Sequence, residues 1–141
     1  MKQGIEFFLK RLKNYYQVNV VETRAAKFSQ REMDRAAKKE AQHLLKALSR
    51  NRDFLVVLDM TGKEMSSEEL ASFLKKRQEM GINSFCFLVG GAYGVTEEIK
   101  RRANLILSLS KMTFTHEMAR LILAEQLYRA ASINAGSPYH H

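Results

Sequence analysis

Three short segments of the sequence carry residue types that bind small ligands. They are the glycine-rich stretch 90–94, the stretch 110–115 with its serine and threonines, and the stretch 59–63, which contains Asp59 and Gly62. Each follows a short apolar run of the kind that forms a buried strand. Adjacent glycines also let the backbone turn sharply and approach a ligand closely. Because the carboxyl ends of parallel strands meet at one edge of a sheet, these segments predict a ligand site at that edge.

Other chemistries are poorly supported by the same residues. The G-G-x-x-G spacing at 90–94 lacks the Gly-x-Gly-x-x-Gly fingerprint of dinucleotide sites, and no phosphate-binding lysine follows it. Ser108 and Ser110 lie outside any G-x-S-x-G elbow, which argues against hydrolase chemistry. Cys86 is the single cysteine, so an intrachain disulfide and a cysteine-based zinc site are both excluded. We expect no metal site.

The apolar pattern predicts a single α/β domain over residues 1–141. Apolar runs at 54–58, 85–89 and 105–109 indicate buried strands, and stretches of helical periodicity separate them. Strands that alternate with helices predict a mostly parallel sheet flanked by helices. No apolar run approaches the roughly 18 residues that span a bilayer, so we expect a cytoplasmic protein that does not engage a membrane.

Capping residues indicate where several of the helices begin and end. Ser66 and Glu69 form a capping box that opens a helix, which Gly81 is suited to terminate. Thr96 is suited to start the next helix, and a long final helix follows the 110–115 loop. Three further elements are expected nearer the start of the chain: a helix over 4–16, a strand over 18–22 and a helix over 29–48.

Positive charge is concentrated in the first third of the sequence. Residues 1–52 hold 13 Lys and Arg against 5 Asp and Glu, whereas residues 53–141 hold 10 of each kind. Such asymmetry suits a protein that approaches a polyanion with one face. A solvated basic helix is the alternative, and charge alone does not decide between the two. If the partner is a nucleic acid, the residues expected to contact its phosphates are Arg24, Lys27, Arg31, Arg35, Lys38 and Lys39.

Five stretches together resemble one known family. They are FLVGGAYG at 87–94, LSLSKMTFTHE at 107–117, EQLYRAASI at 125–133, the pairs Leu58-Asp59 and Gly62-Lys63, and the ending Pro138-Tyr139-His140. They resemble the bacterial ribosomal RNA large-subunit methyltransferase H family, a small SPOUT-class family. The resemblance implies S-adenosylmethionine-dependent methylation of N3 of a pseudouridine in 23S ribosomal RNA, with the assembled ribosome as substrate.

The resemblance also implies a fold and a set of site residues. It implies a SPOUT-type α/β knot, with a C-terminal trefoil, and a homodimer. Members usually begin with a strand and a glycine-containing loop ahead of the helix that opens here at Gly4, and this sequence has neither. The implied S-adenosylmethionine pocket comprises Leu58, Gly90, Leu109, Ser110, Lys111, Met112, Thr113 and Phe114.

The catalytic group is a hypothesis of its own. The N3–H of pseudouridine is a poor nucleophile until its proton leaves, so a nearby base is useful. We expect Tyr139 or His140 to fill that role, or else to stack on or hydrogen-bond the base. Two other functions remain open: a different SPOUT RNA methyltransferase, acting on transfer RNA or on ribose, and a non-catalytic RNA-binding protein.

Overall fold

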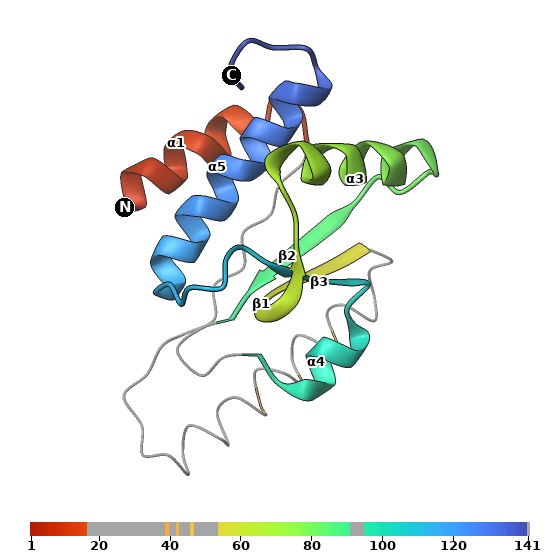
Figure 1. Ribbon diagram of the computed structural model, residues 1–141, viewed down its shortest axis with the longest axis vertical. Helices are drawn as coiled ribbons and strands as arrows, with labels where there is room; N and C mark the ends of the chain where they lie inside the picture. The colour runs from red at the N-terminus through yellow and green to blue at the C-terminus, as the bar shows by residue number, and fades with distance from the viewer. Residues whose placement is uncertain (17–38, 40–41, 43–45, 47–53, 91–94, 141) are drawn as a thin grey trace.

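A computed structural model describes residues 1–16, 39, 42, 46, 54–90 and 95–140 of the chain. Its elements are α1 (Lys2–Leu12), β1 (Phe54–Glu64), α3 (Ser67–Glu79), β2 (Phe85–Val89), α4 (Glu97–Arg102), β3 (Leu105–Ser108) and α5 (His116–Asn134) (Figure 1). None of the described helices combines the length and the apolar character needed to cross a membrane.

The described strands form one parallel sheet in the order β2-β1-β3. The register places Leu58 of β1 opposite Val89 of β2 and Leu107 of β3. Asn104 fixes the start of β3 beside β1: its Oδ1 accepts from the backbone N–H of Leu55 at 2.7 Å, and its own N–H donates to the Leu55 carbonyl at 2.8 Å. The expected parallel α/β sheet is therefore confirmed for the described residues.

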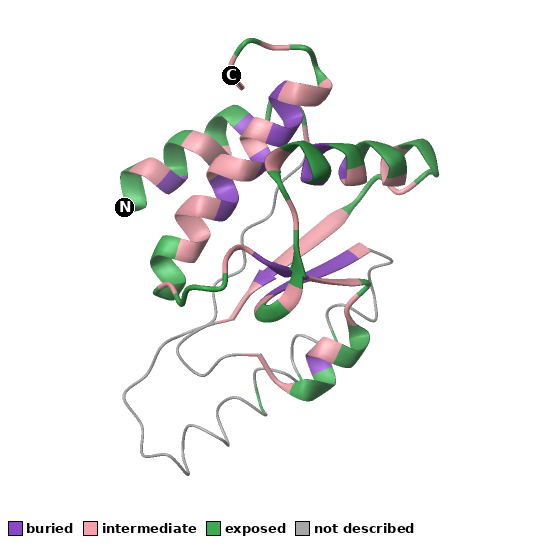
Figure 2. Cartoon of the chain, in the orientation of Figure 1, coloured by how far each residue is buried: buried purple, intermediate pink, exposed green. Residues whose placement is uncertain are grey.

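Both faces of β1 are covered, because successive side chains of a strand point to opposite sides. Val56 and Leu58 pack into a core with α1, α3 and α5, whereas Leu55 and Val57 pack with Leu88 and with α4. Figures 1 and 2 show this arrangement, with α1, α3 and α5 on one side of the sheet and α4 on the other. Burial on both faces explains why the 54–58 run reads as continuously apolar.

The predicted helix ends are confirmed at α3. The Ser66 hydroxyl accepts from the Glu69 N–H at 3.1 Å, and the Glu69 carboxylate accepts from the Ser66 N–H at 3.2 Å. At the other end Gly81 adopts φ +91, while the N–H groups of Gly81 and Ile82 donate back to the carbonyls of Gln78 and Arg77. This is the Schellman pattern, in which a left-handed residue is best supplied by glycine.

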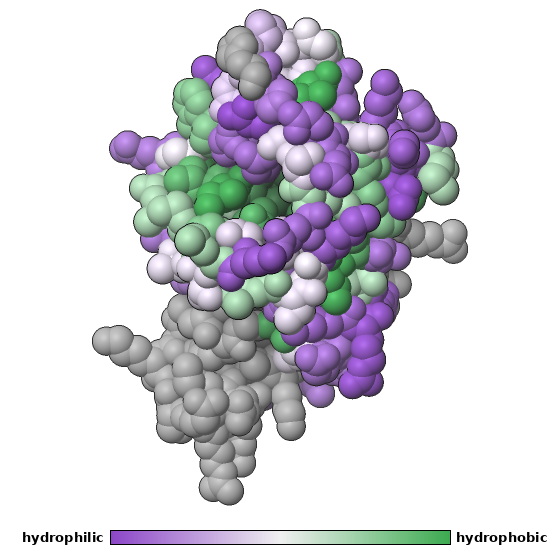
Figure 3. All heavy atoms as spheres, viewed as in Figure 1, coloured by the Kyte–Doolittle hydropathy of each residue, from purple (hydrophilic) through white to green (hydrophobic). Residues whose placement is uncertain are grey.

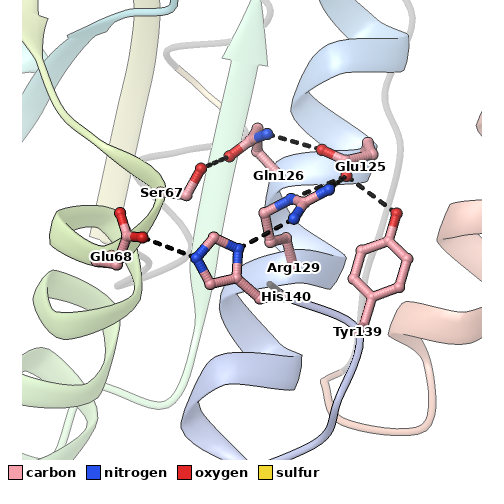
Figure 4. A network of polar contacts seen from close by, with 7 residues as sticks. All are labelled: Ser67, Glu68, Glu125, Gln126, Arg129, Tyr139 and His140. Atoms are coloured by element: carbon pink, nitrogen blue, oxygen red, sulfur yellow. Dashed lines mark hydrogen bonds and ion pairs between the residues drawn. The ribbon is translucent and has the colours of Figure 1, made fainter.

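The same pattern ends α5 and turns the tail back. Gly136 adopts φ +72, its N–H donates to the Ile133 carbonyl, and the N–H of Ser137 donates to the Ser132 carbonyl. The chain after Gly136 therefore reverses direction, and the tail comes back to lie against α5 and the start of α3 (Figures 1 and 4).

Three boundaries differ from the sequence prediction. The helix expected over 4–16 is α1, Lys2–Leu12, and the strand expected over 105–109 ends at Ser108. The larger error concerns 59–63, which was predicted as a loop but lies within β1. The pairing is nevertheless irregular there, because Leu58 and Lys63 both lie opposite Leu107. Residues 59–62 therefore form a bulge in the strand.

The elements expected over 18–22 and 29–48 lie outside the described residues, apart from three positions. Those three, Lys39, Gln42 and Lys46, are helical. The threading of a knot stays a prediction.

Candidate functional site

The carboxyl ends of the strands meet at one edge of the sheet. Gly90 directly follows Val89 of β2, which pairs with Leu58 of β1, and Leu58 pairs in turn with Leu107, two residues before Leu109. The register thus gathers Leu58, Gly90 and Leu109, which the family resemblance implies for one pocket, at the same edge. Leu58 is buried, while Gly90 and Leu109 are half-buried.

The loop after β3 is shaped by its own hydroxyl groups. The buried Ser108 hydroxyl donates to the Ser110 carbonyl at 2.9 Å, and the Ser110 hydroxyl accepts from the Met112 N–H at 3.0 Å. The Thr113 hydroxyl donates to the Met60 sulfur at 3.0 Å, so this loop contacts the bulge of β1. The loop then ends where the Thr115 hydroxyl caps α5 by accepting from the Met118 N–H.

Gly62 brings the bulge of β1 against the backbone of β3. A Cβ at this position would lie 2.6 Å from the carbonyl carbon and oxygen of Ile106 and 2.8 Å from its Cγ2. The carbonyl carbon and oxygen of Ile106 belong to the backbone of β3 and cannot move aside at low energetic cost. A glycine is therefore required for the bulge to lie this close to β3.

Asp59 ties the bulge to α4. Its carboxylate accepts from the backbone N–H of Thr61 at 3.1 Å and from the Thr61 hydroxyl, and Lys100 lies 3.4 Å away. The Thr61 hydroxyl holds the pKa of Asp59 below its usual value; burial opposes this shift, while the Thr61 N–H and Lys100 add to it. The strand edge thus carries an ionised carboxylate paired with a lysine.

The other predicted pocket residues follow Ser110. Lys111, Met112 and Thr113 are exposed, and Phe114 is half-buried. Met112 retains 73% of its accessible surface, so an apolar side chain stands in solvent at this edge. Residues 91–94 of the glycine-rich stretch lie outside the described residues.

The predicted catalytic residues lie in the tail, within a polar network formed with α3 and α5 (Figure 4). Glu125 is its centre: one carboxylate oxygen accepts from the Tyr139 hydroxyl at 3.0 Å and from Arg129 at 2.6 Å and 3.0 Å. Arg129 Nη1 lies 3.0 Å from His140 Nδ1, and His140 Nε2 lies 2.7 Å from Glu68. The tail is thus joined to two helices that are distant in the sequence.

The partners of the network determine its protonation. A guanidinium can only donate, so His140 Nδ1 accepts from Arg129 and Nε2 carries the proton donated to Glu68. The pKa of Glu68 is lowered, first by its own backbone N–H and then by His140. Burial and then Glu125 raise the pKa of Tyr139 above 10.0, so its phenol is protonated at neutral pH. In this arrangement both tail residues are donors.

The residues that hold the tail were not predicted from the sequence. Glu125 and Arg129 are four apart in a helix, a spacing that favours an ion pair, and this signal was present. No pattern in the sequence pointed to Glu68 as a partner of the tail.

Of the expected RNA-binding residues, Lys39 is exposed, whereas Arg24, Lys27, Arg31, Arg35 and Lys38 lie outside the described residues. Over the described ranges, no three His, Cys, Asp or Glu residues are arranged to hold a metal ion.

Comparison with known proteins identifies the family. Residues 1–140 match the family described as "Predicted SPOUT methyltransferase". The chain is 44% identical to the ribosomal RNA large subunit methyltransferase H of Halothermothrix orenii, over 97% of this chain and 88% of that protein. It is 43% identical to the protein of the same name from Dictyoglomus thermophilum and 40% identical to that from Syntrophobacter fumaroxidans, each over 90% of the relative. The chain therefore belongs to the SPOUT methyltransferase family.

Proposed function

We propose that this protein is an S-adenosylmethionine-dependent methyltransferase that methylates N3 of a pseudouridine in 23S ribosomal RNA. The observation that carries the proposal is the strand edge, where the register of β1, β2 and β3 gathers Leu58, Gly90 and Leu109. Relatives 40–44% identical over nearly the whole chain bear the name ribosomal RNA large subunit methyltransferase H, which supports the substrate. A single SPOUT domain over 1–141 is part of the proposal.

The residues at the strand edge fit S-adenosylmethionine. Gly90 and the turn at Ser110 offer backbone groups, the half-buried Leu109 offers apolar surface next to the buried Leu58, and the half-buried Phe114 follows in the same loop. We assign the cofactor to these residues together with Lys111, Met112 and Thr113. When bound, the cofactor supplies a methyl group activated by its sulfonium. The protein chiefly aligns the acceptor nitrogen with that methyl and excludes water.

Tyr139 and His140 are our candidates for orienting the uracil ring or accepting its N3 proton. His140 has both ring nitrogens engaged, by Arg129 and Glu68. It can accept a proton only after giving up the bond from Arg129. Tyr139 is a protonated phenol in this arrangement, so hydrogen bonding to a uracil carbonyl is the simpler role for it.

We further propose a cytoplasmic homodimer that acts on the assembled ribosome, with the basic residues Arg24, Lys27, Arg31, Arg35, Lys38 and Lys39 contacting phosphates. Exposed apolar side chains on and next to α1 and α5 support the dimer: Phe7 of α1 is 47% accessible, and Tyr15, which follows α1, and Met118 of α5 are also exposed. Figure 3 shows an apolar area over these helices, bordered by hydrophilic side chains. Such an area suits contact with a second copy.

Calorimetric titration with S-adenosylmethionine tests the proposal first. We expect saturable binding that is lost in Gly90→Val, because the added side chain occupies the edge where the cofactor lies. Glu79→Gln, an exposed change at the end of α3, is the control and should bind normally. A folded dimer that does not bind the cofactor would instead indicate a non-catalytic RNA-binding protein.

The acceptor is tested separately, by incubating ribosomes with the protein and labelled cofactor and mapping the methyl group. We expect it on N3 of a pseudouridine in 23S ribosomal RNA. A methyl group on transfer RNA or on a ribose would assign the chain to a different SPOUT activity.

A further inference from the structure

We propose that Glu125, Arg129 and Glu68 are positioning residues that fix the rings of Tyr139 and His140 for methyl transfer. This inference rests on the proposed function and deepens it. None of the three is among the residues assigned above to the cofactor or to the RNA. Each reaches the reaction only through the tail.

Glu125 fixes the Tyr139 hydroxyl. The oxygen that accepts from Tyr139 also accepts two hydrogen bonds from Arg129, and the other oxygen accepts from Gln126 Nε2 at 2.7 Å. Gln126 is held in turn by the Ser67 hydroxyl of α3 at 2.6 Å. The carboxylate side chain is only 20% accessible. A carboxylate with both oxygens engaged has one orientation, and so the Tyr139 phenol does too.

Arg129 couples the two tail residues. Its Nε and Nη2 donate to Glu125 while Nη1 donates to His140, and the guanidinium carbon lies 4.9 Å from the centre of the Tyr139 ring. A guanidinium is a rigid planar fork, so one plane sets the direction of all three hydrogen bonds. A lysine would keep the charge but could not form this fork.

Glu68 fixes the proton on His140. It lies in the first turn of α3, where an ionised carboxylate is favoured by the helix dipole. Because Glu68 accepts from Nε2 and Arg129 donates to Nδ1, the imidazole is held in the Nε2–H tautomer. The ring can turn over only by breaking both bonds.

The polar network does more than attach the tail. The reversal at Gly136 directs the chain back without it, and the Tyr139 ring packs on the Tyr128 ring with centroids 4.7 Å apart. These backbone and apolar contacts remain when the polar atoms are changed. Conservative variants should therefore leave the tail docked but its rings free to move, which lowers kcat more than it changes binding.

The kinetic test uses Glu125→Gln, Arg129→Lys and Glu68→Gln in the full-length protein, with Glu79→Gln as the matched control on α3. We expect kcat on ribosomes to fall on the order of 10- to 100-fold for Glu125→Gln and Arg129→Lys, since small misplacements cost that much. The Kd for S-adenosylmethionine and the KM for ribosomes should each stay within about twofold, because uniform binding is untouched. Glu79→Gln should match the wild type.

A second readout does not depend on activity. Long-range 1H–15N spectra of histidine-labelled protein report which ring nitrogen carries the proton, and His140→Gln identifies the His140 signals by their loss. We expect the Nε2–H tautomer in the wild type and a mixture of tautomers in Arg129→Lys and Glu68→Gln.

The outcomes separate the two proposals. Wild-type methyl transfer with unchanged kcat in all three variants, or with a His140 that shows no preferred tautomer, would overturn the positioning role and leave the proposed function standing. A wild-type protein that binds no cofactor and transfers no methyl group would overturn the function, and the inference with it.

Discussion

The strand edge and the tail network are stabilised in opposite ways. At the strand edge, most hydrogen bonds run between near neighbours: Ser108 to Ser110, Ser110 to Met112 and Thr61 to Asp59 each join residues two apart, and the bond from Thr113 to Met60 is the exception. In the tail network, His140 bonds Glu68 across 72 residues, and Tyr139 bonds Glu125 across 14. One region is shaped by local backbone turns, the other by side chains from distant elements.

This difference separates the roles of the two regions. Local turns and glycines present a backbone surface that changes little when one side chain is altered. A network of shared oxygens fixes ring orientation but loses several bonds at once when one member is removed. Backbone changes should therefore affect the strand edge strongly, and side-chain changes there should have small effects.

The largest effect is expected for Gly62→Ala. The new Cβ would lie 2.6 Å from the Ile106 carbonyl, so the bulge must move away from β3. We expect a loss of about 2 to 3 kcal/mol in the free energy of unfolding. Chemical denaturation measures this loss, and calorimetry should show weakened cofactor binding.

Gly4→Ala is the control for this change. There the nearest atom is the flexible Leu121 Cδ1, at 3.0 Å, and the position lies within α1, where alanine is favoured. We expect the free energy of unfolding to change by no more than about 0.5 kcal/mol. An equal effect of the two substitutions would show that the close approach at Gly62 is not special.

A smaller effect is expected for Ser66→Ala, which tests the connection between the two regions. Ser66 caps α3, whose first turn carries Ser67 and Glu68 of the tail network. Loss of the cap should lower the free energy of unfolding by about 1 kcal/mol, which thermal or chemical denaturation measures. Ser72→Ala in the same helix, at an exposed position, should be neutral or slightly stabilising. If both serines behaved alike, the cap would contribute nothing.

The smallest effect is expected for Asp59→Asn, and it depends on pH. The folded protein lowers the pKa of Asp59 below its ordinary value of 3.8, so its stabilising contribution is present above that value and is lost as pH falls through the lowered pKa. Near pH 7 the free energy of unfolding of the wild type should exceed that of the variant by roughly 0.5 to 1 kcal/mol. In acid the two free energies should become equal. Stability curves across pH measure this, and a constant difference in acid would contradict it.

Much of the strand edge was predictable, because its causes lie close together in the sequence. The apolar runs located three strands, the box of Ser66 and Glu69 located α3, and the parallel pairing of the strands followed from their alternation with helices. The bulge at 59–62 was missed. A polar stretch with Gly62 is typical of a loop, whereas in the structure Gly62 packs on Ile106, and Lys63 and Glu64 pair with β3.

The tail network was not predictable in the same way. Tyr139 and His140 were singled out through the family resemblance, but their partners depend on the reversal at Gly136. A Gly-Ser-Pro sequence after a long helix is itself a signal for such an end. The contact between His140 and Glu68 depends on how the tail packs against α3, and no pattern in the sequence predicts it.

The docked tail also determines where this protein can be labelled or immobilised. His140 lies between Glu68 and Arg129, so a fluorophore, affinity tag or surface tether attached after it would crowd two helices at once. Met1 is 53% exposed at the opposite end of the chain, ahead of α1. A label attached at Met1 avoids the residues that hold the tail, which makes this position the better choice for single-molecule or surface-binding measurements.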